Sequence, residues 1–154
     1  MTALRNRSIV AFAQGRRMSQ PDFLDSHQRH LTDAEHLYAL QRYANADHLY
    51  GLSAECGLKR LMQAFGMPLD SDGLPPGPDK KHINKLWPRY EAYRSGMVPG
   101  TRFGLAQDPF TDWQIEQRYE HQGRFTTAVV DPHRQGAADI ATLIRDARAA
   151  GYSL

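Results

Sequence analysis

The stretch Asn45–Gly66, NADHLYGLSAECGLKRLMQAFG, predicts a long helix with one buried face. At 100° per residue its apolar and small residues fall into one broad arc. Four polar residues fall opposite that arc: His48, Glu55, Lys59 and Gln63. A glycine that tolerates the left-handed conformation, followed by Pro68, marks the end of the helix. We expect the rest of the chain to pack around this element.

Small residues gather inside the apolar arc, at Ser53, Ala54, Cys56 and Gly57. A glycine in the middle of a helix costs about 1 kcal/mol relative to alanine. Close approach of another segment is the expected compensation, and a merely tolerated glycine is the alternative. Arg60 also lies inside the arc. Either its long stem reaches out to solvent or its guanidinium meets a buried acceptor.

The composition indicates one domain without disulfides. The chain has 154 residues and a single cysteine, Cys56, which is typical of a small core residue at this position. No run of about 18 apolar residues occurs, so no membrane span is predicted. We therefore expect a cytoplasmic protein.

Positive charge is concentrated in residues 1–21, which contain four arginines and no acidic residue. We interpret this segment as a basic extension that is loosely held, with a transit peptide or a nucleic-acid-binding arm as alternatives. Met18 also offers a second start. Residues 22–154 form the predicted helical domain and carry a net charge of −2. That charge argues against a large phosphate-binding face but leaves room for a local basic patch.

Helical periodicity recurs along the domain. The predicted helices begin at Pro21, at the capping box Thr32–Glu35 (a second helix, or the continuation of one bent helix), at Asn45, at Lys80 (interrupted or restarted at Pro88), at Pro109 after Asp108, and at Pro132 after Asp131. The segments 67–79 and 94–107 predict irregular loops, and 125–130 predicts an extended linker. The fold class is therefore an all-α, up-and-down bundle of five or six helices.

Three segments resemble the HEPN superfamily of small helical bundles. They are ADHLYGLSAECGLKRLM at 46–62, KKHINKLW at 80–87 and DWQIEQRYEH at 112–121, followed by a capped C-terminal helix. The resemblance implies a helical bundle that commonly forms homodimers and acts in prokaryotic toxin–antitoxin or defence systems. Some members are metal-independent ribonucleases, and others are non-catalytic partners of minimal nucleotidyltransferases.

The ribonuclease branch carries an arginine followed four to six residues later by a histidine, near the start of a late helix. Here that place holds Arg118 and His121, at a shorter spacing. Cleavage of RNA needs a near-neutral histidine to take a proton and a fixed arginine to neutralise charge on the phosphate. Residues three apart on a helix face the same side, so the pair is either catalytic or a solvated surface pair. Arg42 and His48 fit the longer spacing, but at the start of another helix, and a chance match explains them.

A basic cluster at Lys80, Lys81, His82 and Lys85 is the candidate binding surface. Three lysines near a helix start oppose the helix dipole, which indicates that they are kept for a phosphate or an acidic partner, unless they are an ordinary polar first turn. The pair Glu55 and Lys59 completes this candidate set.

No metal site or cofactor is predicted. Aspartate and histidine lie one turn apart at Asp33/His36 and Asp79/His82, but the Glu-x-x-His pairs of di-metal bundles are missing. Glycine-rich nucleotide loops are also missing. Three functions follow: a HEPN-like module that binds RNA, a nucleotide or a protein partner; a metal-independent ribonuclease; or a protein-interaction module without nucleic acid.

Overall fold

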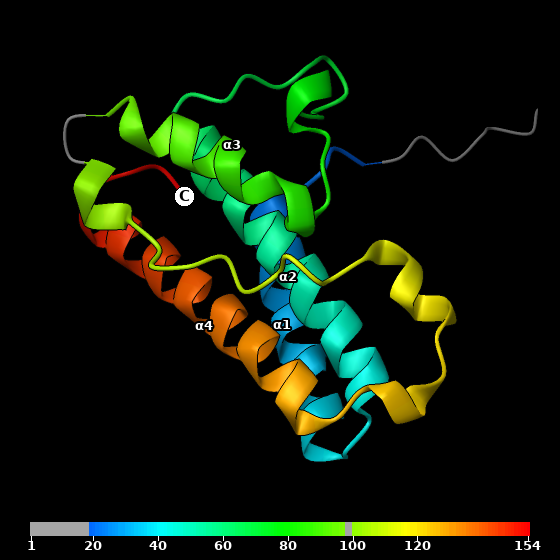
Figure 1. Cartoon of the computed structure of the whole chain (residues 1–154). Helices are drawn as coiled ribbons and strands as arrows, with labels where there is room; N and C mark the ends of the chain where they lie inside the picture. Colours follow the sequence, from blue (N-terminus) through cyan, green and yellow to red (C-terminus); the bar gives the residue numbers. More distant parts are fainter. Residues whose placement is uncertain (1–18, 98–99) are drawn as a thin grey trace, which may run out of the picture.

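The computed structural model describes residues 19–97 and 100–154, so nearly all of the predicted basic extension 1–21, with Met18, lies outside the described residues. Within these residues the fold consists of four α-helices: α1 (Phe23–Ala39), α2 (Tyr43–Ala64), α3 (Ile83–Ser95) and α4 (Thr127–Ala149) (Figure 1). Four short 3₁₀ turns lie between them: η1 (Gly77–Asp79), η2 (Gly100–Phe103), η3 (Ile115–Tyr119) and η4 (Gln122–Arg124). The described residues contain no strand, which confirms the all-α class.

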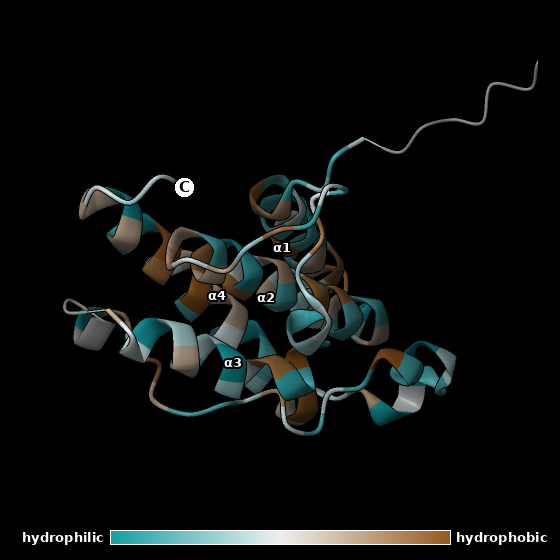
Figure 2. Cartoon of the chain, turned by 90° about the horizontal axis from the view of Figure 1, so that it is seen from above, coloured by the Kyte–Doolittle hydropathy of each residue, from teal (hydrophilic) through white to brown (hydrophobic). Residues whose placement is uncertain are grey.

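The central position of α2 is confirmed. Helices α1, α3 and α4 all pack on it, and hydrophobic positions gather where the helices face one another (Figures 1 and 2). α1 and α4 are bridged by side chains, since Arg134 donates to both carboxylate oxygens of Glu35 at 2.8 and 2.7 Å. Gly66 ends the α2 region with a φ of 103°, as its sequence position predicts.

The small residues of α2 do permit close packing. A Cβ atom on Gly57 would lie 2.5 Å from Cγ2 of Ile140 and 2.8 Å from Nδ1 of His27. A Cβ atom on Gly51 would lie 2.0 Å from the indole of Trp113. Both distances are far below van der Waals contact, so glycine is required at these two positions.

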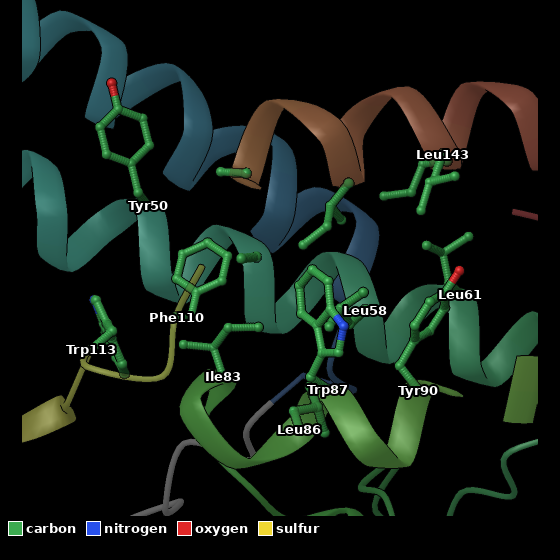
Figure 3. Close-up of a cluster of buried hydrophobic side chains, with 14 of the residues drawn as sticks. Tyr50, Leu58, Leu61, Ile83, Leu86, Trp87, Tyr90, Phe110, Trp113 and Leu143 are labelled. Atoms are coloured by element: carbon green, nitrogen blue, oxygen red, sulfur yellow. The ribbon is translucent and has the colours of Figure 1, made fainter. Parts of the chain in front are cut away.

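Large aromatic side chains fill the space on both sides of α2 (Figure 3). Trp113, Tyr50 and Tyr90 are fully buried. Each polar group finds a partner: the indole of Trp113 donates to the carbonyl oxygen of Asp47 at 3.1 Å, and the Tyr90 hydroxyl donates to the carbonyl oxygen of Phe103 at 2.6 Å. The core therefore buries aromatic area without orphaned donors from these rings.

The first predicted pair of helices is one helix. Asp22 caps α1 by accepting a hydrogen bond from the backbone N–H of Asp25. Thr32 lies inside α1, where its hydroxyl donates to the carbonyl oxygen of Gln28 at 2.9 Å. The expected capping box at Thr32 is wrong because the hydroxyl bonds backwards within a continuous helix.

The predicted helix from Pro109 to about His121 is also wrong. The carboxylate of Asp108 accepts from the backbone N–H of Phe110 and makes a local turn. Phe110 then packs beside Gly136 of α4, whereas Trp113 packs against Gly51 of α2. Residues three apart on a helix share one face, so the chain must unwind to bury these two rings against different helices.

Helix α4 begins earlier than predicted, and the extended linker expected at 125–130 is wrong. Thr126 is the N-cap, and Pro132 is the sixth residue of the helix. Pro88 holds the same position in α3, which continues unbroken to Ser95. Each proline removes one hydrogen bond near the start of its helix, and packing on α2 outweighs that loss. The described residues thus hold four α-helices rather than five or six.

The polar side of α2 is covered rather than solvated. Lys59 is 8% exposed, and the Glu55 side chain is 13% exposed. The two pair at 2.6 Å, and His82, at the start of α3, lies beside them. Arg60 instead reaches outward to the carbonyl oxygen of Ser153.

The loop before α3 is fixed by a buried carboxylate. Asp79 is fully buried and accepts hydrogen bonds from Arg89 at 2.6 Å and from Tyr93 at 2.7 Å.

Within the described residues, no helix combines the length and apolar character needed to cross a membrane.

Candidate functional site

A pocket of about 690 Å³ opens where α1 ends and α2 begins, and the η3–η4 segment forms its other wall. Figure 1 shows how these parts of the chain are arranged. We call this pocket the α2 pocket. Its lining combines cationic, amide and apolar side chains and one carboxylate with the first turn of α2, namely Leu37, Gln41, Arg42, Tyr43, Ala44, Asn45, His48, Leu49, Gln117, Arg118, Glu120, Gln122 and Phe125. The carboxylate, Glu120, pairs with Arg124 at 3.2 Å.

The N-terminus of α2 opens into this pocket without a cap. Arg42 is the N-cap residue, its side chain makes no capping hydrogen bond, and the first turn holds no acidic residue. The first backbone N–H groups of a helix have no partner within the helix. Tyr43, Ala44 and Asn45 all line the pocket, so their N–H groups are the donors that this helix end offers to a ligand.

The turn between α1 and α2 presents this helix end to the pocket. Gln41 has a φ of 59°, a left-handed conformation that glycine usually provides. Its N–H bonds to the carbonyl oxygen of Tyr38, and the N–H of Arg42 bonds to that of Leu37. These two hydrogen bonds end α1 and place Arg42 at the start of α2.

A second guanidinium comes from η3. Arg118 donates to the carbonyl oxygen of Ile115 at 2.9 Å and to the hydroxyl of Tyr119 at 2.9 Å. Its guanidinium carbon also lies 4.6 Å from the centre of the Tyr119 ring. These contacts hold the exposed guanidinium in one place on the pocket wall.

His48 is the titratable group between these cations. Its ring stacks on Trp113 with centroids 5.6 Å apart, and its Nδ1 atom is buried without a hydrogen-bond partner among the described residues. Burial, followed by the nearby charge of Arg118, lowers the pKa of His48 below its usual value. The imidazole is therefore neutral near pH 7 and can accept a proton.

A buried polar cluster lies behind the pocket wall. His133 of α4 is held between two carboxylates, with Asp47 at 2.7 Å from Nδ1 and Asp112 at 3.0 Å from Nε2. Gln117 also donates to Asp47. Burial alone would lower the pKa of His133, but the hydrogen bonds and charges of the two aspartates raise it above its usual value. The His133 ring ties α2, α4 and the segment before η3 together.

The structure gives the two predicted catalytic residues different surroundings. Arg118 lines the α2 pocket, whereas His121 is exposed outside its lining and accepts a hydrogen bond from the N–H of Gly123 as the N-cap of η4. The argument that both share a helix face is wrong, since they belong to successive 3₁₀ turns. Arg42 and His48, which the sequence did not distinguish from a chance match, both line the pocket.

The predicted binding residues fall into two groups. Glu55 contacts both Lys59, at 2.6 Å, and His82, at 3.0 Å. Lys80, Lys81 and Lys85 are exposed around the start of α3, and none of these three lysines pairs with an acidic side chain of the described residues.

Other reactive groups have structural surroundings. Burial raises the pKa of Cys56 to about 11, so its thiol is not a nucleophile at neutral pH. Within residues 19–97 and 100–154 no group of three or more His, Cys, Asp or Glu side chains is arranged to hold a metal ion.

The sequence pattern missed Asp47 and His133. They lie 86 residues apart and meet only because α2 packs on α4, and no local signal marks such a pair. No protein-family model, no curated protein and no solved structure matches this chain.

Proposed function

We propose that this chain is a HEPN-like helical module that binds a phosphate group of RNA or of a nucleotide in the α2 pocket, within a prokaryotic defence or toxin–antitoxin system. One observation carries the proposal: Arg42, Arg118 and the uncapped N-terminus of α2 open into the same pocket. A helix N-terminus carries about half a positive charge and several free N–H donors, which suit an anion. Arginine adds paired donors that match phosphate oxygens.

The rest of the pocket favours a nucleotide over a bare anion. Leu37, Leu49 and Phe125 provide apolar surface on which a base can lie. Exposed amides at Asn45 and Gln122 offer both donors and acceptors toward a base edge. The resemblance of segments 46–62, 80–87 and 112–121 to HEPN proteins supports the assignment to a defence or toxin–antitoxin system.

Binding of a fluorescently labelled single-stranded RNA tests this function. Arg42→Gln and Arg118→Gln should each weaken binding by about tenfold or more, since a hydrogen bond to a charged group contributes about 1.5–3 kcal/mol. Arg145→Gln is the matched control, because Arg145 is exposed on α4 and its hydrogen bond within the described part of the chain goes to Thr142. Unchanged affinity in both pocket variants would refute the proposal. Binding of a protein partner in place of RNA would then become the better account.

The neutral imidazole of His48 beside Arg118 favours ribonuclease activity as a second candidate function. In such a reaction His48 takes the proton of the 2′-hydroxyl, and Arg118 neutralises the charge that develops on the phosphate. The 2′-oxygen bonds to phosphorus as the bond from phosphorus to the 5′-oxygen breaks, and the departing 5′-oxygen takes a proton from water. His48→Ala and Arg118→Gln should abolish cleavage of RNA in the presence of a chelator. Loss of cleavage in His121→Ala, with His48→Ala fully active, would instead assign the reaction to the pair first predicted from sequence.

We also propose that the module acts as a homodimer, as the resemblance to HEPN proteins implies. Light scattering after size exclusion should then give twice the chain mass of 17.5 kDa. A mass of 17.5 kDa at working concentration would contradict this part of the proposal.

A further inference from the structure

The lysines before and within the first turn of α3 form a separate exposed cationic surface. We call Lys80, Lys81, His82 and Lys85 the α3 patch; all four side chains are exposed. His82 is the N-cap of α3, its side chain makes no capping hydrogen bond, and no acidic residue occupies the first turn. Positive side chains at a helix N-terminus repel both one another and the helix dipole. A polyanion on this surface would relieve that repulsion.

The α3 patch lies on the same side of α2 as the α2 pocket. His48 lines the pocket, and Glu55, seven residues later on α2, contacts His82 of the patch at 3.0 Å. Seven residues are close to two helical turns, so His48 and Glu55 share one face. At 1.5 Å per residue they stand about 10 Å apart along the axis. The two cationic surfaces are therefore close neighbours.

The carboxylate between the two surfaces does not interrupt them. Glu55 has a side chain that is only 13% exposed; it pairs with Lys59 at 2.6 Å and contacts His82 at 3.0 Å. A negatively charged chain can thus pass from one surface to the other without meeting an exposed charge on Glu55.

We propose that the ligand is a nucleic-acid strand several nucleotides long, with one phosphate in the α2 pocket and later phosphates on the α3 patch. This inference rests on the proposed function and extends it from a single phosphate to a polymer. From the first turn of α2, where the phosphate would bind, to Glu55 the rise is about 15–18 Å, which corresponds to roughly four to five steps of a stacked strand at about 3.4 Å each. Tyr119, 76% exposed next to Arg118, offers a face for an unpaired base, which favours a single strand.

The salt dependence of binding tests this proposal, because each phosphate contact releases counterions. For a single strand the slope of log K against log salt is about −0.7 per contact. Lys81→Gln/Lys85→Gln should therefore make the slope for a single-stranded RNA octamer shallower by about 1.4 and weaken its binding. The same variant should bind a nucleoside monophosphate as the wild type does. Arg145→Gln/Arg148→Gln removes the same charge from the far part of α4. It should leave the octamer slope and the binding of the monophosphate unchanged.

The outcomes separate this inference from the proposed function. An unchanged octamer slope in Lys81→Gln/Lys85→Gln, with the monophosphate still dependent on Arg42 and Arg118, would overturn the strand and keep the pocket. Loss of monophosphate binding in the lysine variant would also overturn the strand proposal, because it would show that the lysines and the α2 pocket form a single phosphate site. A polyglutamate peptide that displaces the octamer at equal charge concentration would assign the patch to an acidic protein segment instead.

Discussion

Gly51→Ala is the change for which a sequence-based expectation and the structure disagree most. Gly51 lies inside α2, where alanine is favoured over glycine by about 1 kcal/mol. In the structure a Cβ atom at this position would lie 2.0 Å from Cε2 and 2.2 Å from Nε1 of Trp113. Normal contact between such atoms is about 3.5–4.0 Å, so the indole must move by about 1.5 Å.

That movement has a definable cost. Trp113 is fully buried, and overpacking of a core costs about 1–3 kcal/mol. Its hydrogen bond to the carbonyl oxygen of Asp47 adds about 0.5–1.5 kcal/mol if it breaks. After the gain in helix propensity, Gly51→Ala should lower the free energy of unfolding by about 1–3 kcal/mol. Because His48 stacks on Trp113, RNA binding should weaken as well.

Urea unfolding followed by far-ultraviolet circular dichroism measures this cost. Gly77→Ala is the matched control, since a Cβ atom at Gly77 meets nothing within 4 Å, and it should change stability by less than about 0.5 kcal/mol. A Gly51→Ala protein as stable as the wild type, or more stable, would refute the packing of Trp113 against α2.

Two further expectations follow from the site. The pKa of His133 is raised in the folded state, so its stabilisation is fully present below its unfolded value of 6.5 and is lost as pH rises through the folded value. Urea unfolding from pH 6.5 upward should show this loss in the wild type and not in His133→Gln, and an equal loss in both would exclude His133 as the cause. Gln41→Gly should raise stability by about 1 kcal/mol, because glycine adopts the left-handed conformation without strain. It should also weaken RNA binding by removing an amide from the pocket, and unchanged affinity would show that Gln41 does not contact the ligand.

The sequence predicted the centre of the fold because the signals there were redundant. Periodicity, a small-residue patch and a terminal glycine all defined α2, and packing on three sides confirms its role. The prediction that α2 has one buried face was incomplete, because Glu55 and Lys59 on the opposite face are covered as well. Glu55 and Lys59 form a favourable surface pair by spacing alone, and only the position of α3, which no local pattern gives, covers them.

Two identical local signals had different outcomes. Asp108-Pro109 and Asp131-Pro132 both combine a capping residue with proline, and neither begins a helix. At the first, separate burial of Phe110 and Trp113 against two helices prevents regular coiling. At the second, the helix has already started at Thr127, and packing on α2 tolerates the proline. Tertiary contacts decided both cases.

The candidate site was predictable only in part. Arg118 was predicted from the segment that resembles HEPN proteins. The Arg42–His48 spacing could not be distinguished from a chance match before the structure showed that the α1–α2 turn faces η3. The Asp47–His133 pair joins helices far apart in sequence and left no local pattern.

Chemical-shift mapping tests the central claim most directly. Uniformly ¹⁵N-labelled protein would be titrated with a short single-stranded RNA, and every backbone amide followed. The largest shifts should fall on the N–H groups of Tyr43, Ala44 and Asn45, with the arginine side chains of Arg42 and Arg118 shifting alongside them. Saturating shifts elsewhere, with the amides at the start of α2 unmoved, would contradict phosphate recognition by the α2 pocket.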